Sequence, residues 1–134
     1  MEKEVKQQIV DLDLKNVELI SHELSFSELR VKMLECHLSL GQFEDNPRLK
    51  RTIPHKAFES LNMVTAKAGG IMEILEDGEN CLMVNLADSR DLADKILTLK
   101  NNSELMTKLI INGVDLFKKR FSIKIIVEPI MRLM

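Results

Sequence analysis

The feature that most constrains the fold is the alternation of short apolar runs with helical patterns along the chain. Four runs have the length and composition of short strands: residues 16–20 (NVELI), 36–40 (CHLSL), 64–66 (VTA) and 81–84 (CLMV). Strands separated by helices predict a parallel sheet with helices on both faces. We therefore expect an α/β, Rossmann-like fold.

Helical signals fill the intervals between these runs. Ser25 followed by Glu28 matches a capping box, which opens a helix. Pro54 suits the first turn of another helix, where its missing N–H costs nothing. Gly69-Gly70 and Asp77-Gly78 predict tight turns. The predicted helices cover residues 2–13, 25–35, 54–62, 71–75, about 89–100 and 103–120.

Residues 88–134 carry further signals for helices and their ends. Asp88 or Ser89 is expected to cap a helix that Asn101-Asn102 ends. Its predicted inward residues are Leu92, Ala93, Ile96 and Leu97. A final amphipathic segment, bent at Pro129, places four apolar residues on one face: Ile126, Ile130, Leu133 and Met134.

Size and composition limit the function classes. The 134 residues suffice for one domain, and 45% hydrophobic with 30% charged residues is an ordinary globular balance. A net charge of −2, with scattered Lys and Arg, predicts no nucleic-acid surface. Cys36 and Cys81, which both lie in apolar runs, are expected as buried free thiols of a cytoplasmic protein. We find no apolar run of the ~18 residues that a membrane span needs, and no signal peptide.

The segment from Thr52 to Glu59 is the first candidate binding element. If Pro54 is the first helical residue, then His55, Lys56 and Glu59 lie on one side of the helix. A helix start offers free N–H groups and a positive dipole end, both of which favour phosphate. Lys56 adds a cation, and Glu59 can accept hydrogen bonds from a ribose diol. The plainer alternative is a surface helix with a Lys-Glu pair.

Gly69 and Gly70 form the second element. Glycines that follow a strand let backbone amides approach an anionic or sugar ligand closely, although a plain turn is the commoner explanation. A doubly wound sheet binds its ligands at the carboxyl ends of its strands. The residues expected there are His22-Glu23, Gln42 to Arg51, Lys67 to Gly70 and Asn85.

Three consecutive strings resemble the signature of retaining group-1 glycosyltransferases with the GT-B fold. They are RTIPHKAFESLNM, VTAKAGGIMEIL and EDGENCLMV, over residues 51–84. The family pattern is a Pro-x-Lys helix with a Glu, a strand ending in a Gly-Gly loop, and a D-G-x-N turn before a strand. Residues 89–121 also resemble the two closing helices of the family. The resemblance implies that residues 1–134 are part of the C-terminal, donor-binding domain, without the N-terminal acceptor domain.

The resemblance also implies a function and roles for single residues. Such enzymes transfer a glycosyl group with retention, and without a metal, from a UDP- or GDP-type sugar to a sugar or lipid-linked acceptor, as in polysaccharide biosynthesis. Glu59 matches the residue that contacts the donor ribose. Ile53, Pro54, His55 and Lys56, with Thr52 before them, match the diphosphate and sugar site, where Lys56 would stabilise the leaving diphosphate. The segment of His22, Glu23 and Leu24 matches the nucleobase site.

The sequence departs from the family pattern at three places. Arg51 stands where many relatives carry a first Glu of an E-x7-E motif. Asn62-Met63 runs directly into Val64, where relatives have about four more residues, so we expect residues to be missing there. The chain also begins after the family's first strand and its basic diphosphate clamp. We therefore expect weak donor binding and no turnover by this chain alone, with a peripheral membrane location only in a longer parent.

Two non-catalytic domain types and a metal site are the alternatives to a glycosyltransferase. A truncated, non-catalytic α/β interaction module is the main alternative. A response-regulator-like domain would need an acidic cluster at a strand end, but Asp11 and Asp13 precede the NVELI strand. His22, His37 and His55 have no zinc-site spacing, so no metal is expected. The C-terminal apolar helix is expected to contact a second copy or an N-terminal domain.

Overall fold

The computed structural model describes residues 2–48, 50–52 and 63–131. The predicted helix over residues 54–62 therefore lies outside the described residues. Met63, at the junction where residues are expected to be missing, is the first described residue after this gap. The chain divides into two compact units, residues 1–36 and residues 37–134.

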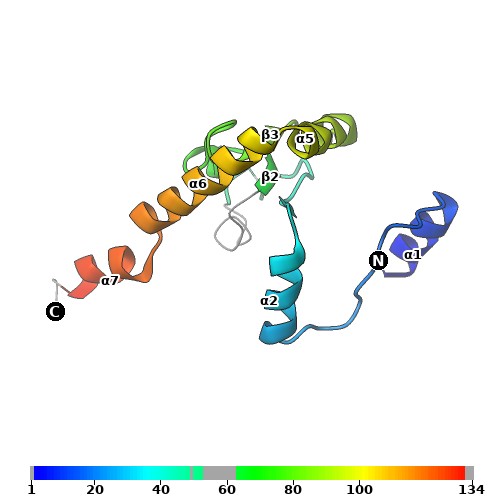
Figure 1. The fold of residues 1–134 in the computed structure, drawn as a ribbon, viewed down its shortest axis with the longest axis horizontal. Helices are drawn as coiled ribbons and strands as arrows, with labels where there is room; N and C mark the ends of the chain where they lie inside the picture. Colours follow the sequence, from blue (N-terminus) through cyan, green and yellow to red (C-terminus); the bar gives the residue numbers. More distant parts are fainter. Residues whose placement is uncertain (1, 49, 53–62, 132–134) are drawn as a thin grey trace. The chain divides into compact units, whose positions relative to one another are not determined.

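The first unit contains two helices, α1 (Glu2–Asp11) and α2 (Phe26–Glu35), both close to their predicted bounds (Figure 1). The predicted capping box of α2 is present: the Ser25 side chain accepts from Glu28 N, and Glu28 Oε2 accepts from Ser25 N at 2.8 Å. None of the described residues of this unit is buried.

The predicted strand over residues 16–20 is wrong, because this segment is irregular in the structure. A strand is stable only where a neighbouring strand takes up its backbone hydrogen bonds. The described part of the first unit offers helices only, so an apolar run with strand-like composition finds no partner there.

The second unit is built on a parallel sheet with strand order β1-β2-β3. Its strands are β1 (Ser39–Leu40), β2 (Met63–Ala66) and β3 (Leu82–Val84). Three of the four predicted strands are thus confirmed, with β1 shorter than expected. In the register of the sheet, Val64 lies beside Leu82 and Ala66 beside Val84.

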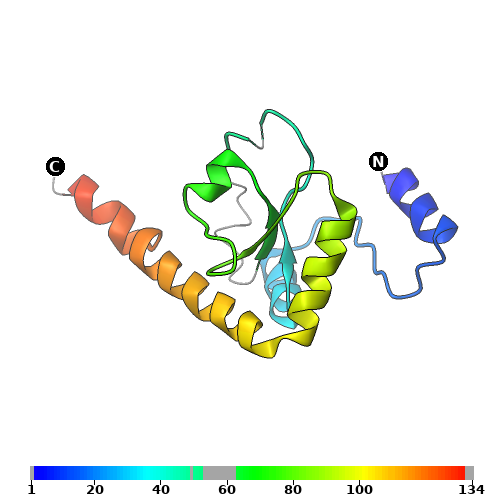
Figure 2. The same cartoon turned by 90° about the horizontal axis from the view of Figure 1, so that it is seen from above.

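Helices cover both faces of this sheet (Figure 2). Alternate strand residues point to opposite faces. One face, formed by Val64, Ala66, Leu82 and Val84, packs with Leu99 of α5 (Ser89–Asn101) and Leu109 of α6 (Ser103–Arg120). On the other face, Cys81 and Met83 pack with Ile71 of α4 (Gly69–Met72). The predicted α/β architecture is confirmed.

Local signals set the ends of several elements. Asp88 caps α5 by accepting from Arg90 N and Asp91 N, and Asn102 caps α6 by accepting from Leu105 N. Gly78 has φ +75°, as the predicted Asp77-Gly78 turn requires. Two details were wrong. The helix expected over residues 71–75 is α4, Gly69–Met72. Ala93 and Leu97 of α5, both expected to face inward, are exposed, and Leu99 is buried instead.

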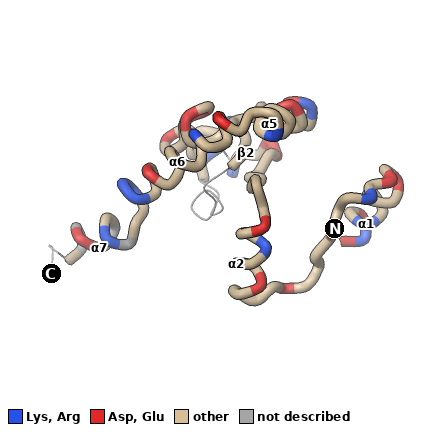
Figure 3. Tube along the Cα trace, in the orientation of Figure 1, with Lys and Arg blue, Asp and Glu red and all other residues tan. Residues whose placement is uncertain are grey.

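The chain ends in α7 (Ile123–Met131). The predicted stripe of Ile126, Ile130, Leu133 and Met134 lies outside the described side chains. Figure 3 shows both signs of charge on each of the helices α1, α2, α5, α6 and α7. In the described part of the chain, no helix combines the length and the apolar character of a membrane span.

Candidate functional site

Three connections meet at the carboxyl edge of the sheet because all three strands run parallel. They are residues 41–52 after β1, residues 67–68 after β2 and residues 85–88 after β3. Ala87 N donates to Phe43 O at 2.7 Å, and Gly70 N donates to Lys50 O at 3.3 Å. The first connection is therefore bonded to the connection after β3 and to the first turn of α4.

Two glycines allow a close approach of backbones in this region. A Cβ on Gly70 would lie 3.0 Å from the carbonyl C and O of Thr52 and 3.1 Å from its N. A Cβ on Gly69 would lie 2.7 Å from the carbonyl O of Lys50. Only a residue without a side chain fits both positions unchanged. The structure thus brings Thr52, Gly69 and Gly70 together, although they were predicted from separate strings.

This contact also changes the role expected of Gly70. Its N–H was predicted to be available to a ligand, but it donates to the carbonyl of Lys50. The Gly70 N–H therefore helps to hold Lys50 in place, near the end of the connection formed by residues 41–52. Gly70 also lets the backbone of Thr52 pack closely against it, and Thr52 leads into the predicted donor-binding segment.

The end of the first connection forms a turn with its own hydrogen bonds. Arg51 N and the Thr52 hydroxyl both donate to Arg48 O, the latter at 3.0 Å. Lys50 Nζ lies 2.8 Å from Asp45 Oδ1, whereas Arg48 and Arg51 have no ion pair with a described residue. Arg48 and Arg51 are both exposed, and Arg51 Nε donates to Pro47 O at 3.4 Å.

Lys67 is a basic group at the same edge, and the sequence reasoning gave it no role of its own. It directly follows β2, and its Nζ lies 4.0 Å from Asp77 Oδ2. Asp77 Oδ1 accepts from Met83 N at 2.8 Å. The Lys67 ammonium thus lies near a carboxylate that is fixed by the backbone of β3, a proximity that no local pattern could have predicted.

Most of the predicted donor site lies outside the described residues. This applies to the two residues expected to act in catalysis, Lys56 and Glu59, and to Ile53, Pro54 and His55. Thr52 is the last described residue before this segment, and it is exposed. The roles of these residues stay predictions.

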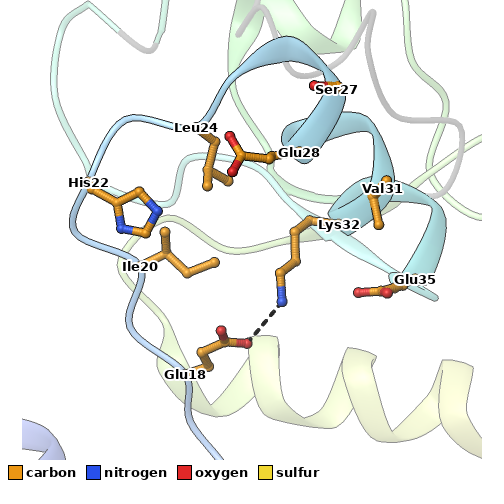
Figure 4. Close-up of a pocket in the computed structure, with 9 residues that line it drawn as sticks. All are labelled: Glu18, Ile20, His22, Leu24, Ser27, Glu28, Val31, Lys32 and Glu35. Atoms are coloured by element: carbon orange, nitrogen blue, oxygen red, sulfur yellow. Dashed lines mark hydrogen bonds and ion pairs between the residues drawn. The ribbon is translucent and has the colours of Figure 1, made fainter.

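The first unit has a pocket of about 450 Å³ that is lined by two of the three residues expected near the nucleobase, His22 and Leu24, but not by Glu23. Figure 4 shows His22, Leu24 and Ile20 along one wall and side chains of α2 along the other. The α2 wall was not predicted, because the contact between this helix and residues 18–24 leaves no local sequence pattern. The α2 residues that line the pocket are Ser27, Glu28, Val31, Lys32 and Glu35.

Hydrogen bonds hold the charged groups of this pocket in place. Lys32 Nζ lies 3.2 Å from Glu18 Oε2. Glu28 Oε2 accepts from Ser25 Oγ at 2.6 Å and from Ser25 N at 2.8 Å. These hydrogen bonds from Ser25 lower the pKa of Glu28, because they stabilise its charged form. Glu28 is therefore occupied by the helix cap.

The cysteines and acidic groups show no reactive centre in the described part of the chain. No group of three or more His, Cys, Asp or Glu residues there could hold a metal ion. Burial, together with the charge of Asp77, raises the pKa of Cys81 to about 12, which keeps its thiol protonated. Cys81 is buried as expected, but the predicted burial of Cys36 is wrong, because its side chain is exposed in the first unit, where no described residue is buried.

Comparison with known proteins identifies similar chains. No protein-family model matches this sequence. An uncharacterised glycosyltransferase of Methanocaldococcus jannaschii is 32% identical over 124 residues, which cover 90% of this chain and 33% of that protein.

Solved structures give the same relationship. HepE of Anabaena in complex with UDP-glucose has a TM-score of 0.81 and 26% identity, covering 98% of this chain and 35% of that one. The C-terminal domain of the group 1 glycosyltransferase LpcC from Francisella tularensis has a TM-score of 0.64 and 25% identity, covering 91% and 63%. These likenesses confirm the expected fold class, a Rossmann-like sheet of the GT-B type. In sequence and fold, the chain is homologous to part of a glycosyltransferase and spans about a third of its length.

Proposed function

We propose that this chain is the donor-binding part of a glycosyltransferase, within the C-terminal domain, and that it binds a uridine diphosphate sugar. The observation that carries the proposal is the likeness to HepE over 98% of the chain, because that enzyme was solved with UDP-glucose and with UDP. The activity of the whole enzyme would need the parts of the relatives that this chain does not span.

The carboxyl edge of the sheet supports a diphosphate site. Arg48, Arg51 and Lys67 supply positive charge there, and Thr52 leads directly into the segment of Lys56 and Glu59. In this proposal Lys56 and the N–H groups at the helix start stabilise charge on the leaving diphosphate. Glu59 accepts hydrogen bonds from the ribose, which orients the donor.

The finer parts of the proposal follow from the resemblance in residues 51–84. We propose transfer with retention and without a metal, to a sugar or lipid-linked acceptor, as in polysaccharide biosynthesis. A cytoplasmic location, peripheral to a membrane in a longer protein, fits such an acceptor. In this scheme the pocket of His22 and Leu24 receives the nucleobase.

A titration of the ¹⁵N-labelled chain with UDP tests the proposal. We expect shifts of the Thr52, Gly69 and Gly70 amides at millimolar UDP. Lys56→Ala should weaken binding by about tenfold or more, since a hydrogen bond to a charged group contributes about 1.5–3 kcal/mol. Glu59→Ala should weaken it similarly while leaving the fold intact.

Matched variants separate a site effect from a general loss of charge. Lys100→Ala and Glu104→Ala change exposed residues of α5 and α6 and should leave UDP binding unchanged. If no diphosphate perturbs residues 52–70 at millimolar concentration, the donor-site proposal is wrong.

Exposed apolar side chains on α7 favour a second candidate, a module that only binds a partner. Ile125 is 42% exposed and Met131 64% exposed. In either candidate, we propose that α7 contacts a second copy or an N-terminal domain. Ile125→Lys with Met131→Lys should then abolish any self-association seen by light scattering, and an unchanged mass of a dimeric species would contradict this contact.

A further inference from the structure

Lys67 and Asp77 form the longest ion pair in the described part of the chain. Their charged atoms, Lys67 Nζ and Asp77 Oδ2, lie 4.0 Å apart, which is beyond hydrogen-bond distance. Lys50, the other described lysine of the three connections at the carboxyl edge, lies 2.8 Å from Asp45 Oδ1. The Lys67 ammonium is thus attracted to a carboxylate that does not hold it by a hydrogen bond.

The two partners of this pair differ in their freedom. Asp77 Oδ1 accepts from Met83 N at 2.8 Å, so the carboxylate is tied to the backbone of β3. The Lys67 side chain is 48% exposed, and its ammonium carries three N–H donors. Ion pairs between groups of such exposure are weak. A second anion at this edge can therefore replace Asp77 as the partner of Lys67.

The backbone of Lys67 lies at the edge where the donor diphosphate is proposed to bind. Lys67 directly follows β2, and its N–H donates to a carbonyl of β3 at 2.8 Å. Gly69 is two residues further on, at most about 7 Å away along the chain. A Cβ on Gly69 would lie 2.7 Å from Lys50 O, and one on Gly70 would lie 3.0 Å from Thr52 O. Two glycines thus connect Lys67 to the residue that precedes the proposed diphosphate segment.

We propose that Lys67 exchanges partners: its ammonium pairs with Asp77 in the free chain and with an anionic oxygen of the diphosphate when a donor binds. A diphosphate carries more negative charge than one carboxylate, so it attracts the ammonium more strongly at an equal distance. This exchange rests on the proposed function and deepens it, because it adds a diphosphate contact and an internal carboxylate that competes for the same cation.

Replacing Lys67 tests the diphosphate contact in calorimetric titrations of the full chain with UDP. Lys67→Met keeps an unbranched side chain and removes the ammonium. We expect it to weaken UDP binding by about tenfold, the low end for a hydrogen bond to a charged group. Lys67→Arg keeps a cation and should bind UDP within about threefold of the unaltered chain.

Asp77→Asn tests the competing carboxylate. Asn retains an Oδ1 that can accept from Met83 N, so β3 should stay in place, but its side chain is uncharged. We expect this variant to bind UDP about two- to fivefold more tightly, because no exposed ion pair has to be broken first. The same substitution should change UDP affinity little in a Lys67→Met background, since no ammonium remains to be released.

Lys100→Met is the matched control. Helix α5 begins beside the carboxyl edge and has 13 residues, about 20 Å, so Lys100 in its last turn lies far from that edge. Its UDP affinity should equal that of the unaltered chain, and circular dichroism should show that all variants keep their helices.

Two results would overturn the exchange. Either Lys67→Met binds UDP as tightly as the unaltered chain, or Asp77→Asn strengthens binding equally with and without Lys67, which would mean that Asp77 acts on the nucleotide directly. In both cases the donor-site proposal still stands on the Lys56 and Glu59 variants. If UDP does not bind the unaltered chain at millimolar concentration, both proposals fall.

Discussion

Replacing Gly70 with Ala tests whether the contact between Gly70 and Thr52 positions the proposed site. The new Cβ would lie 3.0–3.1 Å from three backbone atoms of Thr52. Ordinary contact distances begin near 3.4 Å, so the chain at Thr52 must move by a few tenths of an ångström. Backbone atoms cannot rotate out of the way, unlike the end of a flexible side chain. The strain therefore falls on the residue that leads into the donor segment.

The effect on stability follows from opposing contributions. Overpacking of a well-packed site costs about 1–3 kcal/mol. Ala recovers about 0.4–1 kcal/mol of this, because it restricts the unfolded chain more than Gly does. We expect a net loss of about 1 kcal/mol in the free energy of unfolding and a decrease of a few degrees in Tm for a chain of this length.

Gly78→Ala is the matched control, since it should cost a similar amount for a different reason. Gly78 has φ +75° and open space around its Cβ position, so Ala there is strained by its backbone angle alone, by about 1–2 kcal/mol. It lies in the turn before β3, away from Thr52 in the chain. Thermal unfolding should show a similar decrease in Tm for both variants. Calorimetry should show weaker UDP binding for Gly70→Ala only. Equal UDP affinity in the two variants would refute the positioning role.

Three further predictions concern other contacts of the second unit. Thr65→Val should raise the free energy of unfolding by about 1 kcal/mol, because Thr65 is 1% exposed and its Oγ1 has no hydrogen-bond partner among the described residues; a destabilised variant would contradict this. Cys81, whose pKa is raised to about 12, should contribute stability that is present below about pH 9 and lost as the pH rises toward 12; alkylation at pH 8 should modify Cys36 and spare Cys81, as mass spectrometry can check. Asp88→Ala should cost about 0.5–2 kcal/mol in urea unfolding, because it removes the cap of Arg90 N and Asp91 N, and an unchanged midpoint would count against the cap.

Several features could be predicted from the sequence because they depend on neighbouring residues. The capping box of Ser25 and Glu28 needs only a spacing of three residues, and Asn102 ends one helix and caps the next for the same reason. The turn at Gly78 follows from the backbone freedom of glycine. The strands β2 and β3 were predicted because they are fully buried, so their residues are apolar except for Thr65.

Other features depend on groups that are distant along the chain. Residues 16–20 have the composition of a strand, but strand pairing requires a partner that the described first unit does not contain. Whether Leu97 or Leu99 faces the sheet depends on how α5 lies against β3. A local pattern cannot specify either, since both are set by the free energy of packing between elements.

The candidate site shows the same division. The sequence alone indicated Gly69-Gly70 at the end of a strand and the segment beginning at Thr52, since residue types and their order suffice for that. Only the tertiary structure places Gly70 against the backbone of Thr52, and only it joins His22 and the face of α2 in one pocket. The physical reason is that the absence of a Cβ has a meaning only once it is known which atoms would occupy that space.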